Sequence, residues 1–359
     1  MKKIIVLSIG TLLFLSPLNA EVIKLKSGKV IEADIVGITD KYIKVNLKGL
    51  PLFYFRKTIE SINQQPPEDY LAGKDIIKDE ASSLDFAKGL EEASLGNFKE
   101  AKLYFEKSLD QSLFNDSAKA ALAIIGDLDK GFVNQECATY LFRGISSRIN
   151  DFDDEAIDFY KKAVKADPGY PEAFKGLGNI YASREEFEQA LDYYRKFIKI
   201  NSQDSDVYYN LGICSLALNA VDEAAEYFKK AISINPDDIE VYNKLGVLYA
   251  YLGDFEKTID YFQKSFEINP DDASVCFNLG VAYVATDEPE KAAESFERSV
   301  AINPEYADAY ASLGMVYMGL GEHKKARQNF ERAKDLFSAG QDSESIEEIQ
   351  GYMDKLPRI

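Results

Sequence analysis

The chain is 359 residues long, and its 60 acidic side chains outnumber its 42 basic ones, giving a formal net charge of −18. This balance argues against nucleic acid and anionic membrane surfaces as partners, because both repel a negatively charged protein. With 46% hydrophobic residues, the chain is long enough to form two or three folded domains.

Residues 1–20 have the pattern of a secretory signal peptide. Lys2 and Lys3 precede an apolar run over residues 4–15, and the small residue Ala20 suits a cleavage site. The run is too short to span a bilayer comfortably, so we expect no stable membrane insertion after cleavage. We therefore expect an exported protein, periplasmic or associated with the cell envelope. An uncleaved membrane anchor is the alternative.

Residues 21–65 predict a small all-β domain of four or five strands. Short runs rich in β-branched and aromatic residues alternate in polarity and are separated by turn residues. The runs are residues 22–26, 30–37, 42–47, 53–55 and 59–62. Their order resembles a small SH3-like or Sm-like barrel, a kind of domain often found at the front of exported bacterial proteins. The resemblance implies a folded spacer or docking domain, and Pro66-Pro67 begins a linker over residues 66–81.

Residues 82–136 predict a degenerate repeat followed by an irregular helix. The degenerate copy spans residues 82–115 and keeps four residues in register with the repeats that follow: Gly89, Gly96, Ala101 and Phe105. Residues 116–136 are too few for a second copy. We expect a single helix over residues 118–125, ended near Gly126.

A 34-residue unit then recurs six times over residues 137–340. With Cys137 as place 1, place 8 is always glycine, place 24 is always aromatic, and place 20 is alanine except for Thr258. The glycines are Gly144, Gly178, Gly212, Gly246, Gly280 and Gly314, and the rings are Tyr160, Tyr194, Phe228, Phe262, Phe296 and Phe330. A fixed period of this length indicates a stacked array.

The spacing predicts two antiparallel helices in each unit. Places 4, 7, 8 and 11 share one side of a first helix, and places 20, 24 and 27 share one side of a second. We expect the place-8 glycine to face the place-20 alanine, with the place-24 ring beside them. A single unit cannot bury its apolar side alone, so neighbouring units must stack.

These places resemble the tetratricopeptide repeat, whose pattern is W-x2-L-G-x2-Y, then A-x3-F, then P. Tyrosine or phenylalanine stands for tryptophan at place 4 of five copies, and Cys276 stands there in the fifth. The resemblance implies a right-handed α-solenoid, so the expected fold class is mainly α with a small β-barrel-like domain in front. It also implies a scaffold that binds other proteins without chemistry of its own. Residues 341–359 predict an amphipathic helix that caps the array.

The sequence offers no constellation for catalysis, a metal or a cofactor. His323 has no nucleophile motif beside it, and the three cysteines lack the paired spacing of a zinc or redox site. The acidic run over residues 151–155 lacks the glycine and the distal glutamate of a calcium loop. We therefore expect a non-enzyme with free, buried thiols.

The remaining candidate is the concave groove lined by the first helices. Places 2, 5 or 6, 9 and 12 share the face turned away from the second helix. The candidate residues are Lys175, Asn179, Tyr209, Asn210, Asn243, Lys244, Phe277 and Asn278. Side-chain amides can donate to and accept from any peptide backbone. In some members of the family, asparagines at place 6 hold extended peptides in this way, whereas Gly176 and Lys244 would interrupt such a ladder here.

Tyr-Asn-Leu-Gly is also frequent repeat sequence, which is the plain alternative to a binding role. We expect a non-catalytic scaffold or adaptor of the bacterial cell envelope that binds an extended peptide or partner segment in the groove. The alternative function is an accessory subunit or chaperone of a secretion, outer-membrane or surface-polymer assembly machine.

Overall fold

The computed structural model describes the backbone of residues 21–25, 30–38, 42–47, 50–55, 59–62, 80–109, 115–339 and 342–357. Side chains are described over residues 85–109, 117–338 and 342–357. The expected signal peptide and nearly all of the expected linker lie outside the described residues.

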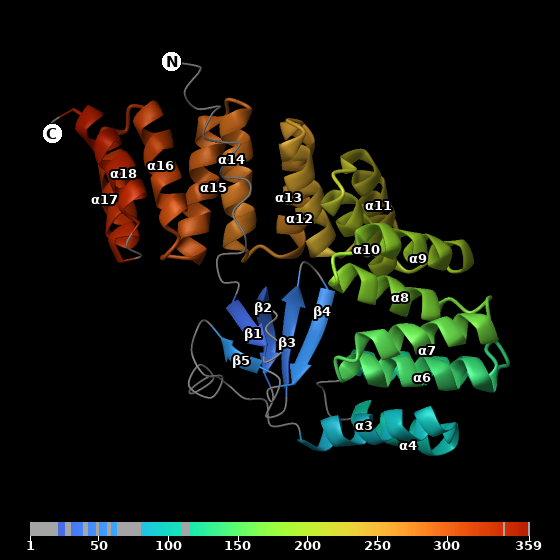
Figure 1. Ribbon diagram of the computed structural model, residues 1–359. Helices are drawn as coiled ribbons and strands as arrows, with labels where there is room; N and C mark the ends of the chain where they lie inside the picture. Colours follow the sequence, from blue (N-terminus) through green and yellow to red (C-terminus); the bar gives the residue numbers. More distant parts are fainter. Residues whose placement is uncertain are drawn as a thin grey trace. The chain divides into compact units, whose positions relative to one another are not determined.

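Five strands make one antiparallel sheet in the order β4-β3-β2-β1-β5 (Figure 1). They are β1 (Glu21–Leu25), β2 (Val30–Ile38), β3 (Tyr42–Leu47), β4 (Leu50–Phe55) and β5 (Ile59–Ile62). Residues 30–33 of β2 pair with β1, whereas residues 34–38 pair with β3, and the register shifts between Ile35 and Gly37. The long strand β2 therefore pairs with β1 along its first part and with β3 along its second part.

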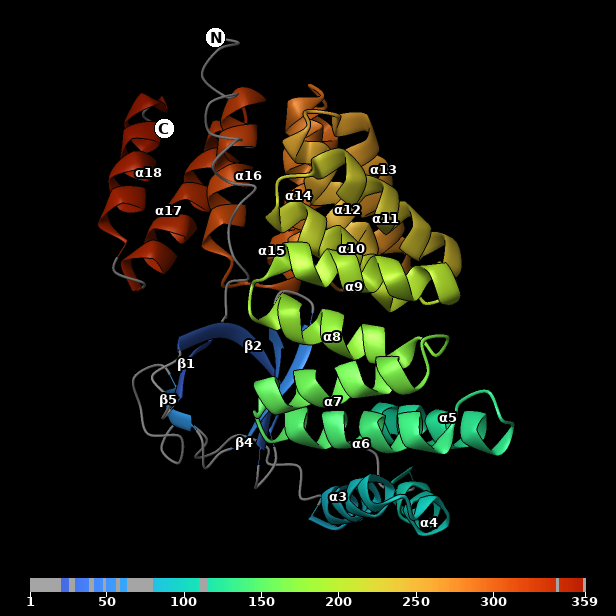
Figure 2. The same ribbon diagram turned by 45° about the vertical axis from the view of Figure 1, so that its right-hand side comes forward.

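Sixteen helices, α3 to α18, follow within the described residues, and most of them lie in antiparallel pairs of successive helices (Figures 1 and 2). They are α3 (Glu80–Leu95), α4 (Phe98–Leu109), α5 (Asn115–Asp129), α6 (Gln135–Ile149), α7 (Asp153–Ala166), α8 (Glu172–Ser183), α9 (Phe187–Ile200), α10 (Ser205–Ala217), α11 (Val221–Ile234), α12 (Ile239–Tyr251), α13 (Phe255–Ile268), α14 (Ala273–Ala285), α15 (Pro289–Ile302), α16 (Ala307–Gly319), α17 (His323–Ala339) and α18 (Ser343–Lys355).

The chain divides into two compact units, and the boundary between Tyr227 and Phe228 falls inside α11. In the unit before the boundary, α3 pairs with α4, α6 with α7, and α8 with α9. In the unit after it, α12 pairs with α13, α14 with α15, and α16 with α17, while α18 packs against α17. Ile349 and Leu356 join the hydrophobic core of this second unit.

The place-8 glycine of the first, second, fourth, fifth and sixth repeats meets the aromatic ring at place 24. A Cβ built on any of these five glycines would lie only 2.5–2.8 Å from that ring. The glycines are Gly144, Gly178, Gly246, Gly280 and Gly314. Real Cβ atoms do not approach so closely, so glycine is what allows the two helices to pack at this distance. Gly89 meets Phe105 at 2.5 Å in the same way, in the degenerate copy. The atoms nearest to each of these Cβ positions belong to the place-24 ring, which is expected beside the glycine.

A left-handed residue at place 15 ends the first helix of every repeat. These residues are Asp151, Glu185, Asn219, Gly253, Asp287 and Gly321, with φ between 60° and 78°. The next residue donates its backbone N–H to the carbonyl five residues back, as Glu186 does to Tyr181 at 2.9 Å. This is the hydrogen-bond pattern of a Schellman motif, which satisfies carbonyls at the end of a helix.

Helix α5 runs through Gly126 to Asp129, so the expectation that it ends near Gly126 is wrong. No atom outside the local backbone lies within 4 Å of a Cβ built on Gly126, so this glycine is not required by packing.

Among the residues that the structure describes, no helix is both long enough and apolar enough to cross a membrane.

Replacing Gly246 by alanine should lower the free energy of unfolding by about 1–3 kcal/mol, because the new methyl group collides with the buried Phe262 ring. Urea unfolding followed by circular dichroism measures the change. The matched control is Gly319→Ala, where the added Cβ meets nothing within 4 Å. Equal stability of the two variants would contradict the proposed role of the glycine–ring contact.

Candidate functional site

The candidate groove residues differ in how far the fold already uses them. Tyr209, Asn210 and Phe277 are 6%, 7% and 2% exposed, respectively, whereas the other five are half-buried. The Phe277 ring lies 5.0 Å from Tyr306 and 5.5 Å from Phe296, so it packs against its own second helix and against the N-cap residue of α16, where the next repeat begins. Place 5 therefore contributes to the interface between repeats in the fifth copy and presents little surface to a ligand there.

Lys175 is paired with Asp204, the last residue of its own repeat, which caps α10, the first helix of the following repeat. Its Nζ lies 2.7 Å from Oδ2 of Asp204, and the other carboxylate oxygen, Oδ1, accepts from the Val207 N–H at the start of α10. Burial alone would lower the pKa of Lys175, but Asp204 and Glu172 outweigh burial and raise it. Lys175 therefore holds two repeats together, and its charge is already compensated.

Burial also perturbs Glu172, one turn before Lys175 on α8. Loss of water raises the pKa of this carboxyl above its ordinary value, Lys175 opposes the shift, and Asp204 and Asp127 add to it. Asp127 accepts from the Tyr170 hydroxyl at 2.9 Å. The start of α8 is thus an acidic cluster with a single lysine among its charged neighbours, which is unfavourable for binding a further carboxylate.

Asn179 and Asn210 are joined through one tyrosine hydroxyl. The Tyr194 hydroxyl donates to Oδ1 of Asn179 at 2.7 Å and is also hydrogen-bonded to the side chain of Asn210. Burial raises the pKa of Tyr194. The structure therefore brings these two predicted residues together, but it engages both amides in the interior of the first unit.

Gly176, at place 6 of the second repeat, is required by packing. A Cβ on Gly176 would lie 2.7 Å from the ring of Tyr160, which belongs to the preceding repeat. No asparagine could stand here without moving that ring. The interruption of the asparagine series at Gly176 thus has a physical cause that the sequence pattern did not reveal.

The candidate residues of the second unit are differently placed. In α14, every side chain from Val275 to Tyr283 is buried except Asn278, which is half-buried. In α12, Asn243 and Lys244 are both half-buried, and Oδ1 of Asn243 is a buried atom without a hydrogen-bond partner in the described structure. These amides lie on the first helices of two consecutive repeats.

The acidic run over residues 151–155 forms ion pairs. Asp153 accepts from Arg148 at 2.8 Å, and Arg184 lies 3.4 Å from Asp153 and 2.8 Å from Asp154. Within the described residues, no group of histidine, cysteine, aspartate and glutamate side chains could hold a metal ion. Cys137, Cys214 and Cys276 are buried and free, and burial raises the pKa of Cys137 and of Cys214 to about 12.

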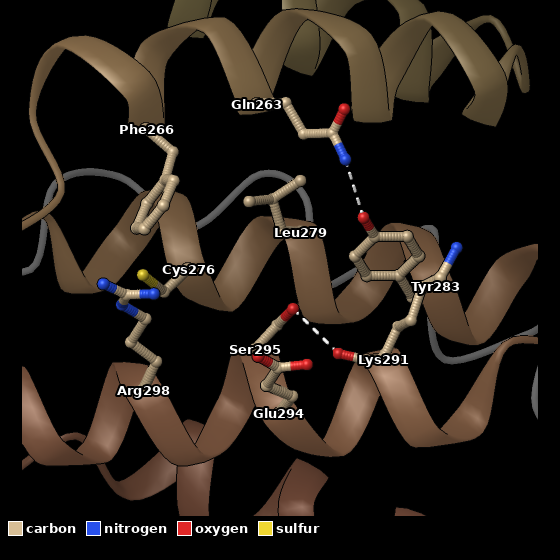
Figure 3. Close-up of a pocket in the computed structure, with 9 residues that line it drawn as sticks. All are labelled: Gln263, Phe266, Cys276, Leu279, Tyr283, Lys291, Glu294, Ser295 and Arg298. Carbon is tan, nitrogen blue, oxygen red and sulfur yellow. Dashed lines mark hydrogen bonds between the residues drawn. The ribbon is translucent and has the colours of Figure 1, made fainter.

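The second unit contains a cavity of about 280 Å³ that was not predicted from the sequence. Its lining residues come from three successive helices: Gln263 and Phe266 from α13, Cys276, Leu279 and Tyr283 from α14, and Lys291, Glu294, Ser295 and Arg298 from α15 (Figure 3). The Gln263 side chain donates to the Tyr283 hydroxyl at 2.8 Å, and the Arg298 guanidinium lies 4.5 Å from the centre of the Phe266 ring. The signals in the sequence were Cys276, which replaces the place-4 aromatic, and Ser295, which replaces the place-23 aromatic of the first four repeats.

Two family models match the chain. The Cilia and flagella-associated protein 70 middle TPR-like domain matches residues 174–336, and the tetratricopeptide repeat matches residues 86–113. The second match lies within residues 82–115, where the degenerate copy is expected. The chain is therefore a tetratricopeptide-repeat protein, and its helix array is a protein-interaction domain of a class that is typically non-catalytic. No curated protein matches it.

Several solved structures are similar over about half of the chain. The crystal structure of MamA protein is 26% identical, with 48% of this chain and 95% of that chain covered and a TM-score of 0.45. YrrB, described as a TPR protein with an unusual peptide-binding site, is 27% identical, with coverage of 53% and 96% and a TM-score of 0.45. MamA from Desulfovibrio magneticus RS-1, from residue 41 to its end, is 22% identical, with coverage of 48% and 97% and a TM-score of 0.44.

Replacing Glu172 by glutamine should stabilise the protein at neutral pH and change little at pH 4. Because folding raises the pKa of Glu172, its contribution to stability is present at low pH and is lost as pH rises from about 4.5 through the raised pKa. Glutamine does not ionise, so the variant keeps this stability at neutral pH. Melting temperatures at pH 4 and pH 7.5 measure the effect. The exposed Glu188→Gln on α9 is the control, and a gain of similar size in both variants would contradict the assignment.

Proposed function

We propose that the second unit binds an extended peptide segment of a partner protein along the first helices α12 and α14. The observation that carries the proposal is Asn278, the half-buried amide within the otherwise buried run from Val275 to Tyr283. An amide in this position can bond both the N–H and the C=O of a peptide backbone whatever its side chains.

Two neighbouring residues support a peptide-binding site along α12 and α14. Lys244 stands at place 6 of the fourth repeat, as Asn278 does in the fifth, and adds a half-buried cation to a strongly acidic chain. Oδ1 of Asn243 is a buried acceptor without a partner among the described residues, and a backbone N–H of a ligand would satisfy it. The amides of the first unit are less suited, since Asn179 and Asn210 already bond Tyr194.

We further propose that residues 21–65 form a small SH3-like or Sm-like barrel that acts as a docking or spacer domain. What supports this is the strand order β4-β3-β2-β1-β5, in which β2 pairs with β1 along one half and with β3 along the other. A register shift in β2, such as the one between Ile35 and Gly37, is a common way of bending a strand around a closed sheet.

We infer a location in the cell envelope from the basic start, the apolar run and Ala20 alone. In that location the array serves as a non-catalytic scaffold or adaptor for exported proteins.

Asn278→Ala should weaken the binding of a groove peptide about two- to tenfold, because one lost hydrogen bond is worth about 0.5–1.5 kcal/mol. The probe is a peptide selected from a random library on the full chain, and calorimetry gives the dissociation constants. The control is Lys264→Ala on α13, which removes an exposed ion pair with Glu267 and should leave affinity unchanged. A loss of affinity in the control, with Asn278→Ala unaffected, would place the peptide elsewhere.

The exported form should begin at Glu21. N-terminal sequencing of protein from the envelope fraction tests this expectation, because cleavage after Ala20 removes Lys2, Lys3 and the apolar run together. Recovery of chains that retain Met1 in a membrane fraction would favour the uncleaved anchor.

A further inference from the structure

The cavity between α13, α14 and α15 lies where other repeats hold a pair of aromatic rings. In the first, third and fourth repeats, the ring at place 4 lies 6.4 Å from the ring at place 23: Tyr140 with Phe159, Tyr208 with Tyr227, and Tyr242 with Tyr261. The fifth repeat has Cys276 and Ser295 at these two places, and both residues line the cavity. The space is therefore the volume that two rings would fill.

A second ring contact is also incomplete in the fifth repeat. In the second and fourth repeats, the tyrosine at place 11 stacks on the tyrosine at place 23 with ring centres 5.4 Å apart: Tyr181 on Tyr193 and Tyr249 on Tyr261. Tyr283 is the place-11 tyrosine of the fifth repeat, and it faces Ser295 in place of a ring. Tyr283 thus retains the position of a stacking platform without its usual partner.

The fifth repeat retains an arginine at place 26, from which the sixth repeat covers its place-4 ring. In the sixth repeat, Arg332 at place 26 has its guanidinium 5.9 Å from the centre of the place-4 ring of Tyr310. Arg298 is the place-26 residue of the fifth repeat, and it lines the cavity while lying over Phe266. A guanidinium over an aromatic face is attracted by the ring's quadrupole, so this position favours an aromatic occupant over an aliphatic one.

We propose that this cavity binds the side-chain ring of a tyrosine or phenylalanine presented by a partner polypeptide. An apolar cavity of about 150 Å³ is enough for benzene, so the observed volume of about 280 Å³ admits a phenol ring. The ring would rest on Leu279 and Cys276, stack on Tyr283 and lie beneath Arg298. Exposed side chains, including Gln263, Lys291 and Glu294, surround the space and leave it open to solvent.

This site is distinct from the proposed groove. Asn278 is two residues from Cys276 and one from Leu279, so at 100° per residue it lies on the other side of α14 from Cys276 and Tyr283. Asn278→Ala should therefore leave ring binding unchanged, and failure of either proposal leaves the other standing.

The test uses N-acetyl-4-fluorophenylalaninamide as the probe and ¹⁹F NMR of the full chain as the readout. We expect a dissociation constant in the millimolar range, which is usual for a ligand of this size. N-acetyl-tyrosinamide should displace the probe, and N-acetyl-leucinamide should do so at least fivefold less well. The double variant Cys276→Tyr, Ser295→Tyr restores the ring pair, fills the cavity and should weaken probe binding at least tenfold.

The control for the double variant is Asn329→Tyr, which adds a tyrosine at place 23 of the sixth repeat and should not change binding. Arg298→Ala removes the guanidinium over the site without filling the cavity and should weaken binding severalfold. If the double variant does not fold, the result for Arg298→Ala alone tests the proposal. Absence of binding to the wild type, unchanged binding in the filled or Arg298 variant, or equal displacement by leucinamide would overturn the proposal. Self-association seen by sedimentation in the wild type and lost in the double variant would also overturn it, since a second copy would then be the occupant.

Discussion

The contact between a glycine and an aromatic ring sets the spacing of the helix pairs, and the other features follow from it. The ring at place 24 is almost completely buried in every repeat, with Tyr194, Phe228, Phe262 and Phe330 at 0% exposure. Any side chain opposite it would force the two helices apart. Because this contact recurs in five of the six repeats, the surrounding places are held in equivalent positions in those repeats, and differences in function can arise only at places outside the contact.

Gly176 shows how this constraint limits the groove. Its neighbour Gly178 meets Tyr194 of its own repeat, while Gly176 meets Tyr160 of the repeat before. One short helix therefore packs against rings on two sides, and place 6 cannot carry an amide there. Asn278 meets no such restriction, and it is half-buried beside Phe277, which supplies the inter-repeat packing. The groove chemistry of each repeat thus depends on which place of the first helix carries that packing.

The sequence predicted the helix pairs because glycine and aromatic residues recur at fixed places, and it predicted the strands from their alternation. It could not predict contacts that join different repeats. Lys175 and Asp204, which caps the first helix of the next repeat, are 29 residues apart, and nothing in the repeat pattern marks them as partners. The left-handed turns were missed because only Gly253 and Gly321 carry the residue that usually signals them, whereas Glu185 adopts the same backbone with a side chain. The cavity was missed because it results from two substitutions that only three-dimensional packing places together.

A repeat array can tolerate such a cavity because its stability is close to a sum of terms from single repeats and their interfaces. Without rings at places 4 and 23 the fifth repeat lacks two aromatic contacts, each worth about 0.5–1.5 kcal/mol beyond the buried area, and other repeats are not disturbed. The glycine–ring contact of the same repeat persists, since a Cβ on Gly280 would still lie 2.6 Å from Phe296. The backbone around the cavity is therefore fixed by a contact that does not depend on what fills the cavity. Tyr283 and Arg298 are held in place in advance, so a partner's ring would lose less ordering entropy on binding than it would at a site that had to form around it.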